Sequence, residues 1–441
     1  MKLFATLLLT AAPGIAAAQA APTVTFTDTR LANGLRLIVA EDHNAPVYSI
    51  AVTYMVGSRD ERGGRTGFAH LFEHMMFKGS ENVGPGEHFT LVFNNGGSMN
   101  GTTNKDRTLY FETLPANQLE LGLFLEADRM RSLEITTENL DNQRHAVQEE
   151  RRLGVDNQPY GKTFEAVDSL AYDNVAYEHS VIGSMVDLNA ASVGDVASFF
   201  KTYYAPNNAV LAIVGDVTTV DVLSRVRRHF ESIPAQPQPP RVDMTEPAQR
   251  AQRRMTIDDP LARLARVDIV FKVPPSMTAD DDALNVLATV LGGGRSSRLY
   301  EQVVRQRQLA SNISAFRGES MGPGLFRIIG TAAPGKSIAD VEAAIHGEIE
   351  RVSTASVADW EIRKARATAR RSLVAGLQSS LQRAIQLSQY AAFYDNPGLI
   401  NTRAARLDAV TAADVQRVAR QYLTIENRTV VTTNPKPAAG R

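Results

Sequence analysis

The sequence predicts an α+β protein of two homologous domains, each a mainly antiparallel sheet packed by helices. Three observations lead to this prediction. Strand-like runs in the first half are followed by helices instead of alternating with them regularly. A proline-rich stretch, residues 234–240, interrupts the chain near its middle. A pattern of residues near position 200 recurs near position 420, which indicates a duplicated unit.

The composition is typical of a globular protein with a large core. The chain has 441 residues, 44% hydrophobic and 22% charged, with a formal net charge of -1 and no cysteine. A chain of this length usually divides into domains. Because it has no long basic run, we expect no nucleic-acid partner. Without cysteine, any zinc site must use histidine and carboxylate ligands.

The first twenty residues have the pattern of a secretory signal peptide. Lys2 is followed by an apolar run and then by small residues that end at Ala20. Cleavage is expected after Ala20, with Ala18 as the alternative, because small residues precede both sites. The apolar run is too short for a permanent anchor. We therefore expect an exported, periplasmic protein with no membrane span after signal removal.

Turn signals and hydrophobic periodicity define the elements of the first domain, residues 21–233. Asn33-Gly34 lies between two β-rich runs and predicts a hairpin. Apolar residues recur at helical spacing from Thr66 to Gly79, which predicts a short buried helix capped by that glycine. Further elements are expected as strands at 47–56 and 108–113 and helices at 119–130 and 137–153.

The proline-rich stretch marks the domain boundary. Residues 234–241 are expected to form a semi-rigid linker, because proline cannot continue a helix, and residues 242–441 the second domain. The internal repeat supports this division, since five residues recur 219 positions later: Ser192, Asp195, Val196, Tyr203 and Asn208 as Thr411, Asp414, Val415, Tyr422 and Asn427. Both copies predict a capped helix followed by a strand.

The segment His70-Leu71-Phe72-Glu73-His74 lies within the short helix. Positions i and i+4 share one helix face, so both imidazoles can reach one ion with Glu73 beside them. The apolar residues of the helix occupy the opposite side. The pattern therefore predicts a metal site with His70 and His74 as ligands.

A catalytic zinc site usually takes three ligands from the protein and keeps a water molecule in the fourth position. The polar helix ends in Glu149-Glu150, and Glu150 follows His74 by 76 residues (150 − 74 = 76). Glu150 is preferred to Glu149 as third ligand because it shares a helix face with apolar residues. A structural site, the alternative, would need a fourth protein ligand, and none is evident near the motif.

The ligand types predict a mechanism. Two imidazoles and one carboxylate leave a divalent ion positively charged, which makes its water acidic near neutral pH. Glu73 would accept that proton and return it to the departing amine of a cleaved peptide bond. The other six histidines are expected to be structural. Gly292-Gly293-Gly294 lacks the lysine of a phosphate-binding loop and is expected to end a helix or form a turn.

The segment His70 to Ser80, HLFEHMMFKGS, resembles the inverted zinc motif of the pitrilysin (insulinase) family, which includes the mitochondrial processing peptidase. The likeness covers nearly the whole mature chain. It implies a processing-peptidase-like fold and a zinc-dependent endopeptidase that acts on unfolded peptides or small proteins. It further implies one zinc ion per chain, held by His70, His74 and Glu150, with Glu73 as catalytic base. These ligands also suit manganese or cobalt.

The resemblance also implies how a peptide substrate binds. In the family, a Gly-Gly-x-x-Asn segment leads into an edge strand that pairs with the extended substrate. Asn100, Gly101 and Thr102 are therefore expected to line the cleft. Strand addition of this kind recognises the peptide backbone with little sequence preference. The alternative is an ordinary turn and strand.

Two features depart from the family pattern. Many members have a glutamate seven residues before the third ligand, where this chain has Gln143; its amide can still orient a ligand but is no carboxylate. The family often has an Arg and a Tyr, seven apart, that contact the substrate from the second domain. This chain has Val304 and Ser311 there, and a shift by one brings Arg305 into place without a tyrosine.

The missing Arg/Tyr pair predicts a two-chain assembly. Some family members divide the zinc motif and this pair between two chains, so a homologous partner is expected to supply the pair, with a homodimer as the alternative. A different interpretation is a non-catalytic peptide-binding or assembly subunit. The four intact motif residues argue against that interpretation.

Overall fold

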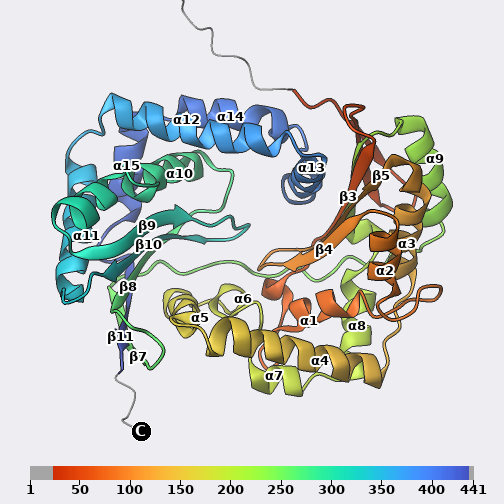
Figure 1. Cartoon of the computed structure of the whole chain (residues 1–441), viewed down its shortest axis with the longest axis horizontal. Coiled ribbons are helices and arrows are strands. Elements are labelled where there is room, and N and C mark those ends of the chain that lie inside the picture. The colour runs from red at the N-terminus through yellow and green to blue at the C-terminus, as the bar shows by residue number, and fades with distance from the viewer. Residues whose placement is uncertain (1–22, 437–441) are drawn as a thin grey trace, which may run out of the picture.

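The structure is a computed structural model that describes residues 23–436. The predicted signal peptide, residues 1–20, lies outside the described residues. Figure 1 shows two halves side by side, each built on one sheet with helices around it. The predicted α+β fold class is confirmed. Within residues 23–436, no helix is both long enough and apolar enough to cross a membrane.

The sheet of the first half has six strands in the order β1-β2-β6-β3-β5-β4. Only β2 and β6 pair in parallel among these neighbours. β1 and β2 form the hairpin predicted at Asn33-Gly34, and Gly34 takes a φ of 89°. β4 lies at an edge. The strands are β1 Thr27–Arg30, β2 Arg36–Glu41, β3 Val47–Tyr54, β4 Ser98–Thr103, β5 Thr108–Pro115 and β6 Ala209–Gly215.

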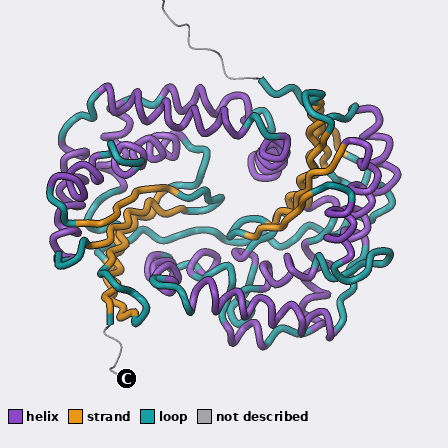
Figure 2. The backbone as a smooth tube through the Cα atoms, viewed as in Figure 1, coloured by secondary structure: helices purple, strands orange, loops and turns teal. Residues whose placement is uncertain are grey.

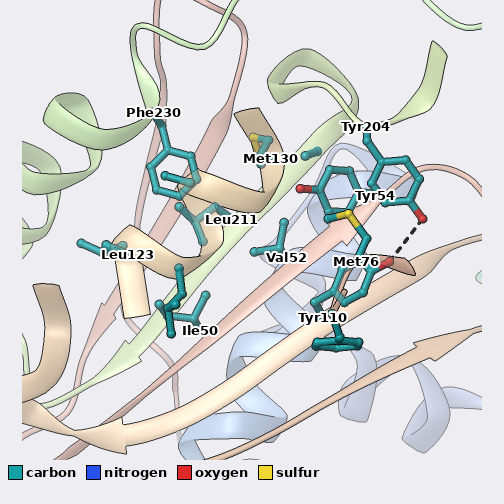
Figure 3. Close-up of a cluster of buried hydrophobic side chains, with 14 of the residues drawn as sticks. Ile50, Val52, Tyr54, Met76, Tyr110, Leu123, Met130, Tyr204, Leu211 and Phe230 are labelled. Atoms are coloured by element: carbon teal, nitrogen blue, oxygen red, sulfur yellow. Dashed lines mark hydrogen bonds between the residues drawn. The ribbon is translucent and has the colours of Figure 1, made fainter. Parts of the chain in front are cut away.

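Helices of the first half cover one face of this sheet and close a core (Figure 3). Ile50, Val52 and Tyr54 alternate along β3 and point into that core, as expected for a strand. The Tyr110 and Tyr204 hydroxyls are 3.4 Å apart within it. The helices are α1 Phe68–Met75, α2 Glu87–Asn94, α3 Leu119–Arg131, α4 Thr137–Arg151, α5 Gly161–Ala171, α6 Val175–Glu178, α7 Met185–Asn189, α8 Val193–Tyr203 and α9 Thr219–Phe230.

The sheet of the second half has five strands in the order β7-β11-β8-β10-β9, with β7 and β11 in parallel. Its core is a separate cluster of buried residues. The strands are β7 Arg253–Asp259, β8 Arg266–Val273, β9 Ala310–Arg317, β10 Gly324–Ala332 and β11 Arg428–Pro435. The helices are α10 Ala279–Gly292, α11 Ile338–Thr354, α12 Asp359–Gly376, α13 Ser380–Tyr394, α14 Leu399–Ala409 and α15 Ala412–Tyr422.

The two halves repeat one another at the spacing that the sequence predicts. β8 begins 219 residues after β3 (266 − 47 = 219), and α11, α13, α15 and β11 follow α3, α5, α8 and β6 by the same interval. Local hydrogen bonds recur as well. The Asn208 amide donates to the Tyr203 carbonyl at 2.8 Å, and the Asn427 amide donates to the Tyr422 carbonyl at 2.8 Å. These repeats support a duplication of the whole unit.

Each half lends one helix to the sheet of the other. α13, from the second half, packs against β3 and β6 and buries Leu387 there. α5, from the first half, packs against β8 and β11 and buries Val167. Figure 2 shows both helices between the two sheets. Residues 234–252 contain no helix or strand, and the domain boundary at 234–241 stays a prediction.

Candidate metal centre

α1 carries the His-x-x-Glu-His segment, and its start is fixed by buried groups. The Glu61 carboxylate accepts hydrogen bonds from the backbone N–H groups of Gly67 at 2.9 Å and Ala69 at 2.7 Å. A carboxylate at this end of a helix is favoured by the helix dipole. Gly67 has a φ of 88°, and a Cβ there would lie 2.6 Å from the Ile182 carbonyl oxygen. The helix is shorter than predicted, since it ends at Met75.

The apolar face of α1 is held in the core of the first half. Leu71, Phe72 and Met75 are buried, and the Phe72 ring lies 4.2 Å from the Tyr204 ring, centroid to centroid. Since i and i+4 residues share a face, this packing leaves His70, Glu73 and His74 on the opposite side. The amphipathic arrangement predicted from the sequence is thereby present.

α4 brings Glu150 to the two histidines. Glu150 Oε2 lies 3.3 Å from His74 Nε2 and 3.6 Å from His70 Nε2, and all three donor atoms lie within 4.8 Å of one another. Ligands about 2.0–2.2 Å from a tetrahedral ion are separated by roughly 3.3–3.5 Å, so this set fits zinc. The neighbouring Glu149 instead pairs with Arg152.

The surroundings set the charge of the donors. Burial, together with the neighbouring His74, lowers the pKa of His70 to about 4. A neutral imidazole is the form that can bind a metal. The His74 imidazole holds the pKa of Glu150 below its ordinary value. At neutral pH the site therefore offers a neutral His70 imidazole and an ionised Glu150 carboxylate.

The Glu73 side chain extends from α1 towards the edge strand β4. Its side chain is largely buried, and burial raises the pKa of its carboxyl group. The Thr103 hydroxyl donates to Glu73 Oε2 at 2.6 Å. Gly101 lies directly opposite, where a Cβ would come within 2.9 Å of Glu73 Oε1. The sequence did not single out Thr103 or Glu61; Thr103 directly follows the residues expected to line the cleft, and Glu61 carries no local signal.

The residues expected to bind substrate are all on β4, at the edge of the first sheet. Asn100 is exposed, and its Oδ1 accepts a hydrogen bond from the Gly101 N–H at 2.9 Å. The Thr102 carbonyl accepts a hydrogen bond from Arg107 at 2.6 Å. The predicted edge strand is thus present, and its role in binding a peptide stays a prediction.

Gln143, Val304 and Ser311 make their contacts with residues other than the donor set. Gln143 is buried on α4 and donates to Asn142 Oδ1 at 2.6 Å. Within residues 23–436 it makes no hydrogen bond to a predicted ligand, and His70 Nδ1 has no partner. Val304 packs against the second core, while Ser311 lies on β9 with its hydroxyl 3.3 Å from the Thr331 carbonyl.

A second group of His and carboxylate side chains lies in the core of the first half. His88, Glu112 and Glu126 are buried together, with His88 Nε2 3.6 Å from Glu112 Oε2. Arg129 is buried beside them and donates from Nε to Glu126 Oε2 at 3.0 Å. Burial raises the pKa of Glu112 and lowers that of His88. Because Arg129 already supplies a cation, we interpret its contact with Glu126 as a structural ion pair, with His88 and Glu112 packed beside it.

Comparison with known families matches most of the described chain. Residues 36–184 match the family described as "Insulinase (Peptidase family M16)". Residues 190–369 match the family described as "Peptidase M16 inactive domain". The first match covers α1, β4 and α4, and the second begins just before α8.

Individual relatives match over nearly their full length. The chain is 30% identical over 408 residues to the "Zinc protease PqqE" of Helicobacter pylori, which covers 92% of each chain. It is 25% identical to the "Probable mitochondrial-processing peptidase subunit beta" of Arabidopsis thaliana, covering 90% of this chain and 76% of that protein. A protease structure from Helicobacter pylori has a TM-score of 0.89 and 29% identity, covering 93% of this chain and all of that chain.

A more distant structure shares the fold alone. The first half of the periplasmic protease PqqL from Escherichia coli has a TM-score of 0.75 at 17% identity. It covers 95% of this chain and 94% of that chain. The two-sheet architecture is therefore common to proteins of little sequence similarity.

Proposed function

Because this chain belongs to the insulinase family of peptidases, M16, we propose that it is a zinc-dependent endopeptidase. The zinc ion would be held by His70, His74 and Glu150, one ion per chain. The observation that carries the proposal is the approach of Glu150, from α4, to within 3.6 Å of both histidine nitrogens on α1. That relatives are named zinc proteases supports the same metal and the same class of reaction.

The chain's own groups suit peptide hydrolysis. A zinc ion at this site would supply Lewis acidity to a water molecule and to the substrate carbonyl. Glu73, beside the two histidines, would accept a proton from the attacking water and deliver it to the leaving amine. Its burial suits both tasks, because a raised pKa makes the carboxylate a stronger base and lets the carboxyl group keep the accepted proton until the amine departs.

The substrate would bind along β4. The free edge of this strand passes Glu73, and an extended peptide can add to it as a further strand. Asn100, Gly101 and Thr102 would then line the cleft, and backbone pairing would favour unfolded peptides or small proteins over folded domains. Gln143 would orient a metal ligand through its amide, although in the described residues that amide donates to Asn142 instead.

We also propose that the chain works with a homologous partner chain, with a homodimer as the alternative. Val304 and Ser311 offer neither an arginine nor a tyrosine, so a second chain would supply that pair. The relative named as a processing peptidase beta subunit is by its name one subunit of an assembly. Export to the periplasm is likewise proposed, on the sequence pattern of residues 1–20 alone.

A non-catalytic peptide-binding or assembly subunit is the second candidate. The match of residues 190–369 to a domain described as inactive favours it for the second half. The complete donor set of the first half favours catalysis.

The test measures zinc per chain and cleavage of a quenched, unstructured peptide by the mature chain. Glu73→Gln should keep zinc and lose cleavage, whereas Glu150→Gln should lose both. Glu149→Gln is the matched control, since that side chain pairs with Arg152, and it should behave as wild type. Each protein is assayed with and without a co-purified homologue. Zinc binding without cleavage under any pairing would favour the binding-subunit interpretation.

A further inference from the structure

The edge strand β4 presents alternate residues in two directions. The Asn104 N–H donates to the Arg107 carbonyl at 2.9 Å, so these residues form a hydrogen-bonded pair at the β4–β5 turn. Hydrogen-bonded and non-hydrogen-bonded pairs alternate along antiparallel strands. In the observed register, Thr103↔Thr108 and Gly101↔Tyr110 are therefore non-hydrogen-bonded pairs. The backbone N–H and C=O groups of Gly101 and Thr103 point to the free edge.

The side-chain positions of the same two residues face α1. A Cβ on Gly101 would lie 2.9 Å from Glu73 Oε1, and the Thr103 hydroxyl donates to Glu73 Oε2 at 2.6 Å. Gly101 thus leaves room for the carboxylate, and Thr103 binds it. Within residues 23–436, Oε1 accepts no hydrogen bond, so the two oxygens of Glu73 are in different situations.

We propose that Thr103 is a positioning residue for Glu73: its hydroxyl fixes Oε2 and leaves Oε1 free to accept a proton from the attacking water. This inference rests on the proposed peptidase function. It also links binding to chemistry, because a peptide that pairs with the free edge engages the backbone of the residue that holds the base. A base held in one orientation before the reaction does not have to be ordered during it.

Arg107, a cation on the β4–β5 turn, does not replace Thr103 in this role. Its Nη1 donates to the Thr102 carbonyl oxygen at 2.6 Å, and no hydrogen bond from Arg107 to Glu73 is present in the described part of the chain. The Thr103 hydroxyl is therefore the group whose removal should release the carboxylate.

Three substitutions in the full mature protein test the proposal. Thr103→Val keeps a β-branched side chain but removes the hydroxyl. Thr103→Ser keeps the hydroxyl and removes only the methyl group. Thr113→Val is the matched control, because it removes a hydroxyl from the neighbouring strand that bonds to Ser49 at 2.7 Å, away from Glu73. The assays measure kcat and KM on an unstructured peptide and zinc per chain, and crystal structures of wild type and Thr103→Val locate the Glu73 carboxylate.

Thr103→Val should lower kcat by about 10- to 100-fold, the effect of a lost hydrogen bond to a charged group. KM and zinc content should stay within about twofold, and Thr103→Ser should recover most of kcat. In the crystal, the carboxylate should leave its wild-type position in Thr103→Val. Wild-type kcat in Thr103→Val, equal losses in the valine and serine variants, or an unmoved carboxylate would overturn the proposal.

The failure of the proposed function is a separate result. If the wild-type chain binds zinc and cleaves no peptide, the peptidase assignment fails. The crystallographic comparison still decides whether Thr103 holds Glu73, because it does not depend on turnover.

Discussion

The two halves of the molecule share one framework, yet within residues 23–436 the groups of His and carboxylate side chains that could hold a metal lie in the first half. Five pairs of corresponding elements in the two halves begin 219 residues apart. Counting this interval from His70, Glu73, His74 and Glu150 leads to Thr289, Gly292, Gly293 and Ala369. No carboxylate or imidazole stands at those four places. The repeated architecture therefore does not depend on the donor set. The buried apolar residues of the two cores are enough to maintain it.

The contact between helix and edge strand differs in a matching way. In the first half, Glu73 on the helix faces Gly101 on β4. In the second half, Gly292 ends α10 and faces β9, where a Cβ would lie 2.6 Å from the Ala315 Cβ. The glycine thus stands on the strand in one half and on the helix in the other. The first arrangement leaves space for a carboxylate, and the second closes that space.

The largest expected difference between the halves is in metal binding. His70→Ala should reduce zinc per chain to near zero and lower peptidase activity by at least about 100-fold, since loss of a ligand should cost more than loss of a group that supports one. Thr289→Ala, at the counterpart position, should leave both within about twofold. Zinc analysis and initial rates on one peptide decide the matter. Loss of zinc in Thr289→Ala would contradict the asymmetry.

The exchanged helices should couple the stability of the halves. Leu387→Ala on α13 is expected to cost about 2–5 kcal/mol of unfolding free energy, because it leaves a cavity against the first sheet. Val167→Ala on α5 should cost less, about 1–3 kcal/mol. Urea unfolding is followed by circular dichroism and by fluorescence of Trp360, the single tryptophan. If Val167→Ala does not shift the unfolding midpoint measured by Trp360 fluorescence, the halves unfold independently.

The two glycines should respond to a methyl group in different ways. Gly292→Ala is expected to lower the unfolding free energy by about 1–3 kcal/mol, because the Cβ meets strand β9, with kcat unchanged. Gly101→Ala meets the movable end of Glu73, so its stability should change little while kcat falls a few-fold. Chemical unfolding and steady-state kinetics on both variants measure this. A rate loss in Gly292→Ala with normal stability would reverse the comparison.

The smallest expected difference is in pH dependence. Burial raises the pKa of Asp60, in the first half, to about 6, so the folded state holds this proton more tightly and stability falls as pH rises from about 4 to 6. Hydrogen bonding to His346 lowers the pKa of Glu342, in the second half, to about 2, so its contribution is full above about 4.5 and is lost as pH falls towards 2.

Asp60→Asn should reduce the fall of the unfolding free energy between about pH 4 and 6. Glu342→Gln should reduce its fall as pH drops from about 4.5 towards 2. Both are measured by urea unfolding between pH 2 and 8 in a His70→Ala background, so that zinc release does not contribute. Unchanged slopes in both variants would show that other groups set the pH dependence.

Much of the site could be predicted because its signals are local. The helical spacing of the apolar residues in α1 and the i, i+4 histidines are properties of one short segment. Glu150 required more, since the ligand lies on another helix, but the amphipathic face of α4 already separated it from Glu149. Thr103 and Glu61 could not be found in this way, because a hydroxyl near the end of a strand and a glutamate in a loop resemble ordinary surface residues until neighbouring elements pack.

By itself, the sequence determined the α+β class, the repeat, the helix that carries His70, Glu73 and His74, and the hairpin at Asn33-Gly34. These depend on turn chemistry and on periods of two and 3.6 residues, which act over a few positions. Only the tertiary structure decided which half lends which helix, that Thr103 holds Glu73, and that Glu61 fixes the start of α1. Such contacts join residues on separate elements, and packing of the two cores sets their distances.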